Sequence, residues 1–134
     1  ALALSQSLAP WVFREWGEQR RLPQAEVERL RSQTDILFDA IWQHLNARQD
    51  FRRRPVTWNV NFPFTTAPDW QIVPTFLGHT FYGSCFKKHG DRFQHELDPL
   101  QEDTRDRADG YVVKQGHVSM TCLDILQLGQ QVEG

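Results

Sequence analysis

The sequence has few of the residues that build covalent or metal crosslinks. Its 134 residues include two cysteines and one methionine. Cys85 and Cys122 belong to no CxxC or Cys/His spacing, so they form neither a disulfide framework nor a zinc site of the usual spacing. We therefore expect both thiols to be small buried hydrophobic groups.

Long apolar runs and a strong excess of one charge are also missing. No run approaches the roughly 20 apolar residues of a membrane helix, and the start lacks the basic-then-apolar build of a signal peptide. The net charge is -2, which disfavours nucleic acid and anionic membranes as partners. With 40% apolar and 24% charged residues, the chain is predicted to be soluble, globular and cytoplasmic.

Short catalytic motifs are absent as well. There is no GxSxG, GxxxxGK or GxGxxG, and no two of the five histidines have an HxH, HxxxH or HExxH spacing. The adjacent acids Glu102 and Asp103 lie in a polar stretch, which indicates an exposed loop rather than a metal site. His44 and His117 lie in apolar patterns and are interpreted as packing residues. No catalytic, cofactor-binding or metal-binding residue is assigned to this chain.

Apolar periodicity predicts the elements of the first half. Ala1–Ser5 is typical of a strand buried on both faces, and Pro10–Gly17 of a short helix. Apolar residues at three- and four-residue steps predict a long helix from Pro23 to about Arg48, with a possible new start capped by Ser32. Val56–Pro63 alternates with period two and is predicted to be a strand.

Turn residues divide the next part of the chain. Arg52–Arg54 could bind phosphate but indicates a solvated turn, since exposed charge is the default. Gln71–Thr75 and Thr80–Gly83 are predicted as short extended segments. Cys85–Leu97 is predicted to be a hairpin with its bend at Gly90.

The last part of the chain is predicted to hold a loop, a helix and a further strand of the core. Asp98–Asp106 is acidic and predicted as an exposed loop. Asp109 is expected to cap a helix over Gly110–Gln115, with Gly116 as its C′ residue. His117–Thr121 is predicted to be a strand, and a leucine-rich tail follows it.

Several aromatic residues in the middle of the chain could stack on a nucleobase, although their spacing indicates core and interface positions first. They are Trp58, Trp70, Phe76, Phe81, Tyr82 and Phe86.

Three motifs resemble the SurE-like survival proteins, a family of metal-dependent 5′(3′)-nucleotidases. ALALS at 1–5 is similar to the family's IPAIALS, and WNVNFP at 58–63 to LNVNxP. The stretch 108–123 is similar to TDxxAxxxGYVSITPL, in the same order and at matching spacing. The sequence departs from the family pattern at Ala108, Val112, His117 and Cys122.

The resemblance spans nearly the whole chain but only the second half of the family. It implies an α/β protein in which this chain supplies the later strands and helices of a Rossmann-like three-layer sheet domain, with a projecting β-hairpin arm. Residues 1–134 are then the carboxyl-terminal part of a single domain. Within it, 1–80 form sheet and helices, 81–97 the β-arm, and 98–134 the last helix, strand and tail.

The same resemblance implies the function. The complete protein would hydrolyse nucleoside monophosphates with Mg²⁺ or Mn²⁺, which residues upstream of this chain would bind. An apolar strand at Ala1 with nothing before it supports the expectation that further residues precede it. The arm, together with the carboxyl-terminal segment, implies a homodimer or homotetramer. The alternative is a non-catalytic oligomerisation or ligand-binding module.

Overall fold

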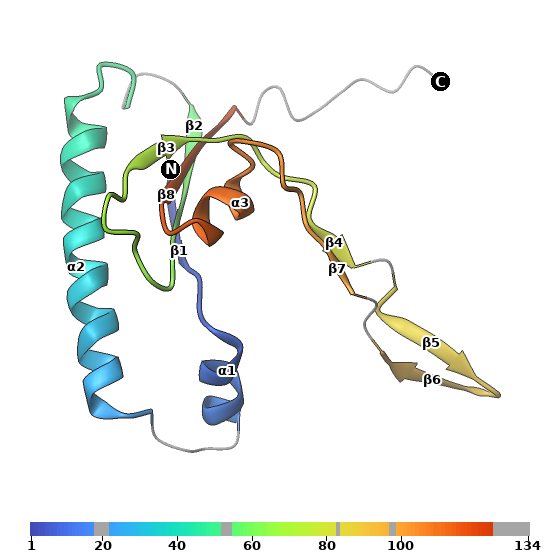
Figure 1. The fold of residues 1–134 in the computed structure, drawn as a ribbon. Coiled ribbons are helices and arrows are strands. Elements are labelled where there is room, and N and C mark those ends of the chain that lie inside the picture. Colours follow the sequence, from blue (N-terminus) through green and yellow to red (C-terminus); the bar gives the residue numbers. More distant parts are fainter. Residues whose placement is uncertain (18–21, 52–54, 83, 97–98, 125–134) are drawn as a thin grey trace, which may run out of the picture.

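The computed structural model describes residues 1–17, 22–51, 55–82, 84–96 and 99–124. They form a mixed α/β fold around a four-stranded sheet, which confirms the predicted class (Figure 1). The elements in chain order are β1 (Leu2–Gln6), α1 (Pro10–Gly17), α2 (Gln24–Ala47), β2 (Val56–Phe62), β3 (Ile72–Pro74), β4 (Phe81–Tyr82), β5 (Phe86–His89), β6 (Arg92–His95), β7 (Leu100–Gln101), α3 (Asp109–Lys114) and β8 (Val118–Asp124).

The sheet has the strand order β1-β2-β8-β3. β1 and β2 are parallel, so the chain must cross over between them, and it does so through α1 and α2. β8 runs antiparallel to β2 and parallel to β3. The last of the described strands in sequence is therefore inserted in the middle of the sheet.

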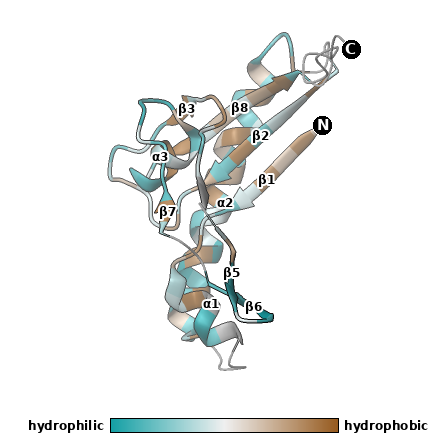
Figure 2. Ribbon diagram, turned by 90° about the vertical axis from the view of Figure 1, so that its right-hand side faces the viewer, coloured by the Kyte–Doolittle hydropathy of each residue, from teal (hydrophilic) through white to brown (hydrophobic). Residues whose placement is uncertain are grey.

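The two faces of the sheet differ in polarity because side chains alternate along each strand. β2 buries every second residue, from Val56 to Phe62, against α2. The residues between them are half-buried and polar. Figure 2 shows the hydrophobic residues along β1, β2 and β8. The core cluster consists of Leu37, Ile41, Leu45, Val56, Trp58, Val60, Phe62, Val118 and Met120.

α2 runs without interruption from Gln24 to Ala47, so the predicted new start at Ser32 is wrong. Ser32 is exposed and its neighbours keep helical hydrogen bonding. The apolar face is best buried after it, where Leu37, Ile41 and Leu45 are all fully buried, and Leu30 before it is half-buried. Packing against the sheet therefore outweighs the local capping preference of a serine.

β1 is a strand as predicted, but it is not buried on both faces. Ala3, Leu4 and Ser5 are exposed, and Leu4 keeps 42% of its surface accessible. The reason is position: β1 is the outermost strand, and among the described residues only β2 pairs with it.

Two short ribbons lie away from the sheet (Figure 1). β4 pairs with β7, and β5 pairs with β6 as the predicted hairpin, with Gly90 at its bend in a left-handed conformation (φ 61°). The stretch 98–106 is therefore not wholly an exposed loop, because β7 pairs within it and the Asp103 side chain is only 6% exposed.

Gly116 follows α3 as the predicted C′ residue. Its φ of 86° is left-handed, and a Cβ placed there would lie 2.6 Å from the backbone nitrogen of Ala67. That nitrogen donates to the Gly116 carbonyl oxygen at 3.0 Å. A glycine is required here for two reasons. It adopts the left-handed conformation that ends the helix, and it lacks the Cβ that would collide with the loop at Ala67.

Three further predictions of burial are wrong. Cys85 and Cys122 are exposed: Cys85 adjoins a two-stranded ribbon, and Cys122 lies in the last part of β8, where burial ends after Thr121. His44 is also exposed, because it lies outside the helical stripe that meets the sheet. Local sequence pattern did not carry this information.

Two predicted segments, Arg52–Arg54 and the leucine-rich tail beyond Asp124, lie outside the described residues. Within the described part of the chain, no helix has the length and apolar character needed to cross a membrane.

A matched pair of isoleucines on α2 tests the core. Ile41 is fully buried and Ile36 is 60% exposed. We expect Ile41→Ala to lower the free energy of unfolding by about 2–5 kcal/mol, because it leaves a cavity under the sheet. Ile36→Ala should change it by less than about 0.5 kcal/mol. Urea unfolding followed by circular dichroism measures both, and equal effects would mean that α2 does not pack on this sheet through Ile41.

Candidate functional site

A groove lies at the carboxyl ends of the parallel strands β1 and β2. It consists of two cavities of about 580 and 370 Å³ that share Ser7, Thr80, Gly110 and Val113 in their linings. The carboxyl ends of parallel strands are the usual place for ligands in open α/β sheets. The groove is therefore the candidate functional site among the described residues.

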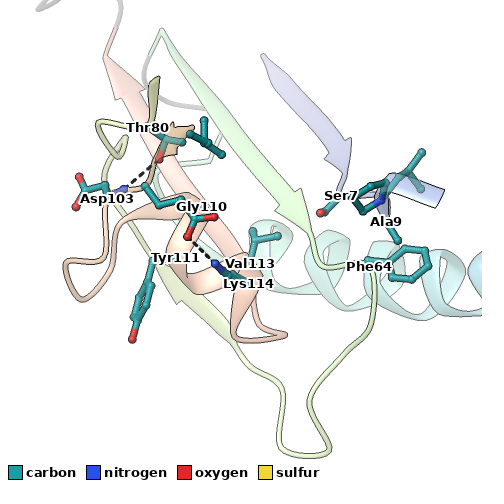
Figure 3. Close-up of a pocket in the computed structure, with 13 residues that line it drawn as sticks. Ser7, Ala9, Phe64, Thr80, Asp103, Gly110, Tyr111, Val113 and Lys114 are labelled. Atoms are coloured by element: carbon teal, nitrogen blue, oxygen red, sulfur yellow. Dashed lines mark hydrogen bonds and ion pairs between the residues drawn. The ribbon is translucent and has the colours of Figure 1, made fainter. Parts of the chain in front are cut away.

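The walls of the larger cavity come from separate parts of the chain. Ser7 and Ala9, from the connection between β1 and α1, lie on one side with Phe64 (Figure 3). Val113 and Lys114 of α3 lie on the other side. The phenyl ring of Phe64 is fixed by an edge contact with Trp11 and by the Arg29 guanidinium, 4.9 Å from its centroid.

The floor of the smaller cavity includes a polar row across three strands. Ser5, Asn61 and Ser119 lie directly opposite one another in the sheet register. The Ser5 hydroxyl donates to Asn61 Oδ1, and Asn61 Nδ2 donates to Ser119 Oγ at 2.9 Å. Ser119 is fully buried, so its hydroxyl needs this bond. The row fixes the orientation of the Asn61 amide.

Asp109 is held differently from the prediction. It was expected to cap a helix starting at Gly110, but Ala108 occupies the cap position and Asp109 is the first helical residue. Its Oδ1 accepts from the backbone N–H of Gly78 at 2.9 Å and of Gly110 at 2.8 Å. The carboxylate therefore ties the segment before β4 to α3, and it lines the smaller cavity.

Asp103, one of the two adjacent acids, stabilises its loop. Its carboxylate accepts from the Arg105 guanidinium at 2.6 Å and from the His79 backbone N–H at 2.9 Å. The hydrogen bonds from Arg105, followed by that from His79, hold the pKa of Asp103 well below its ordinary value. Glu102 accepts from Lys114 Nζ at 2.5 Å. Both acids are engaged in ion pairs.

The histidines are dispersed. His89 contacts Glu96 on the hairpin, and His95 packs edge-on against Phe86. His117 lies just before β8, is half-buried, and its Nδ1 accepts from the Gln71 N–H at 3.3 Å, which gives it a structural contact.

No metal centre is formed by the described residues, since nowhere do three or more His, Cys, Asp or Glu side chains gather as ligands would. A divalent ion such as Mg²⁺ requires several oxygen ligands at one point. The described residues therefore do not fit a magnesium or manganese site, and no catalytic step through a metal is assigned to them.

The aromatic residues considered for stacking are mostly elsewhere. Trp58 is buried in the core, Trp70 packs against it, and Phe76 is covered by the Arg105 guanidinium at 4.8 Å. Phe86 is 60% exposed on the hairpin. The side chains of Phe81 and Tyr82 lie outside the described residues. Phe64, which lines the groove, was not among the predicted candidates.

The groove residues were missed because none of them belongs to a recognised catalytic or ligand-binding motif; ALALS and WNVNFP, which contain Ser5 and Asn61, were used only for the family resemblance. Ser5 and Asn61 are each near the end of a predicted strand, and that position was the available signal. The position of a residue at a strand end indicates a ligand site only when the two strands are known to be parallel neighbours.

No protein-family model matches this chain, and no curated protein matches it.

The ion pair of Asp103 predicts an acid-sensitive loop. A carboxyl whose pKa is lowered in the folded state stabilises the fold above its unfolded pKa of about 3.9 and loses that contribution as pH falls below it. We expect unfolding free energy to decrease between pH 5 and pH 2 more steeply in the wild type than in Asp103→Asn. Asp106→Asn, an exposed neighbour, serves as the control. Parallel profiles for the wild type and Asp103→Asn in urea unfolding would contradict this role.

Proposed function

We propose that this chain is the carboxyl-terminal part of a SurE-like 5′/3′-nucleotidase that hydrolyses nucleoside monophosphates to nucleoside and phosphate. In this proposal the chain serves as scaffold and assembly surface. Residues outside it would bind Mg²⁺ or Mn²⁺, and the enzyme would be cytoplasmic. The observation that carries the proposal is an open, apolar sheet edge at β1, beside the groove.

The outer edge of β1 supports a missing neighbour. Its backbone N–H and C=O groups have no strand partner in the described chain on the side away from β2. Such an edge is a template for a further strand. Leu4, on the face that looks toward α2, is 42% exposed there.

α2 carries an apolar strip on the same side. Thr34 contacts Gln6 of β1 through its hydroxyl. Phe38 and Trp42 follow Thr34 at one and two turns, so they lie on the same side of α2 as its contact with β1. They are 40% and 43% exposed, and their rings stack with centroids 6.3 Å apart. A strand added beside β1 would cover this strip, and such an extended sheet is the basis of the three-layer Rossmann-like arrangement in the proposal.

The hairpin supports assembly into a homodimer or homotetramer. The β5–β6 register places Phe86, Lys88, Phe93 and His95 on one face. Phe86 is 60% and Phe93 72% exposed. Exposed aromatic residues of this kind are typical of association surfaces. The same face also favours the second candidate, a non-catalytic oligomerisation module, which the activity measurement distinguishes.

The first test is activity. We expect the full-length protein to release phosphate from nucleoside monophosphates with Mn²⁺ and to lose this activity in EDTA, because the ion supplies the Lewis acid. The 134-residue chain alone should release none. Metal-dependent phosphate release by this chain would contradict the division of roles, and a folded full-length protein inert toward nucleotides would favour the oligomerisation module.

The second test concerns the apolar strip. If a further strand covers it, Trp42 is buried in the full-length protein, and Trp42→Ala should lower the unfolding free energy by about 3 kcal/mol or more. The adjacent exposed residue gives the control, Gln43→Ala, with an effect within about 0.5 kcal/mol. Urea unfolding of both full-length variants measures these two changes in unfolding free energy. A loss of only about 1 kcal/mol or less for Trp42→Ala would mean that the strip stays open to solvent.

A further inference from the structure

The charge lining the groove is unsuited to an anionic group. Three carboxylates line it, those of Glu102, Asp103 and Asp109, against the single ammonium of Lys114. Lys114 already donates to Glu102. Arg105 pairs with Asp103, so Asp109 is the lining carboxylate with no ion pair among the described residues. A phosphate placed beside it would meet net negative charge, which raises its binding free energy. The groove therefore favours a neutral ligand.

The hydrogen-bonding groups of the smaller cavity suit hydroxyl groups. Asp109 Oδ1 is used twice, whereas Oδ2 accepts from no donor among the residues described. Thr80 Oγ1 accepts from the Asp103 N–H at 3.3 Å, so its own proton remains to be donated. Asn61 Nδ2 gives one hydrogen to Ser119 and has a second. Asp109, Thr80 and Asn61 all line the smaller cavity, which thus has both acceptors and donors in its lining.

We propose that the groove binds a ligand through two neighbouring hydroxyl groups, as in a ribose cis-diol, with Asp109 as the residue that selects for them. A hydroxyl both donates and accepts, so one diol can donate to Asp109 Oδ2 and accept from Thr80 or Asn61. A carboxylate that accepts a hydrogen bond from a hydroxyl forms the stronger, charge-assisted kind of hydrogen bond.

The larger cavity continues from this point with apolar groups. Ala9, Pro10, Phe64, Leu100 and Val113 line it. Its volume of about 580 Å³ is within the range of small-ligand sites. A planar ring attached to the sugar can occupy this space, and the phosphate of a nucleoside 5′-monophosphate, whose 2′- and 3′-hydroxyls are both free, then lies outside the groove. The identification of the diol with a nucleoside rests on the proposed function; the selection of hydroxyls rests on the lining alone.

The experiment measures binding rather than turnover. Isothermal titration calorimetry of the full-length protein in EDTA compares adenosine, 2′,3′-dideoxyadenosine and inorganic phosphate. We expect adenosine to bind at least about tenfold more tightly than the dideoxy compound, since a hydrogen bond to a charged group is lost. Inorganic phosphate should not compete with adenosine.

Two variants locate the effect. Asp109→Asn keeps an oxygen for the N–H groups of Gly78 and Gly110, and Thr80→Val removes only a hydroxyl. Asp109→Asn should weaken adenosine binding about tenfold, and Thr80→Val should weaken it less. Both variants should leave dideoxyadenosine binding unchanged. Asp69→Asn and Thr66→Val, outside the groove lining, are the matched controls and should bind adenosine as the wild type does.

The outcomes separate the two proposals. Equal binding of adenosine and dideoxyadenosine, absence of adenosine binding, or wild-type affinity in Asp109→Asn would each overturn the hydroxyl-selective groove, even if the protein hydrolyses nucleotides. Hydroxyl-dependent binding in a protein that releases no phosphate would support the groove and refute the nucleotidase.

Discussion

The register of β2 is the constraint on which the rest depends. Its residues alternate between the core under α2 and the polar face of the sheet, and it has neighbours on both sides. Trp58, Val60 and Phe62 fill the core, while Asn61 joins the polar row beside the groove. A slip of one residue would exchange the two sets, placing an amide under α2 and an aromatic ring in the groove floor. The hydrophobic core therefore also fixes the geometry of the candidate site.

Local pattern predicted the elements whose stability is local or strongly periodic. α1, α2, β2 and the hairpin follow from proline, helical spacing, alternation and a bend at Gly90. The predictions that failed depend on distant neighbours: the burial of β1 on both faces, the burial of Cys122, and an exposed loop over 98–106, where β7 pairs with β4. The carboxylate of Asp109 is a further example, because its partner Gly78 is 31 residues away. A side chain's environment is set by tertiary packing, which periodicity in one segment does not encode.

The acidic stretch after the hairpin illustrates how charge is used in this fold. Asp103 and Glu102 are engaged by Arg105 and Lys114, so the loop is held by ion pairs close to the groove. The exposed Glu102–Lys114 pair contributes little to stability by itself, whereas Asp103 is largely covered. The effect of the two pairs here is on the groove. Lys114, the cation in the groove lining, is engaged by Glu102, so hydroxyl, amide and carboxylate groups remain to contact a ligand. The loop thereby favours neutral polar ligands over anions.

The open edge and the groove meet at one corner of the sheet. β1 ends at Gln6, and Ser5, Gln6 and Ser7 line the smaller cavity. A strand that paired in parallel with β1 would bring its carboxyl end to the same corner, because parallel strands end on the same side. Side chains following that strand would then face the open side of the groove, opposite the α3 wall. A phosphate kept out of the acidic groove would lie next to those side chains. The two proposals therefore fit one geometry, in which this chain holds the sugar and a neighbouring strand supplies the chemistry.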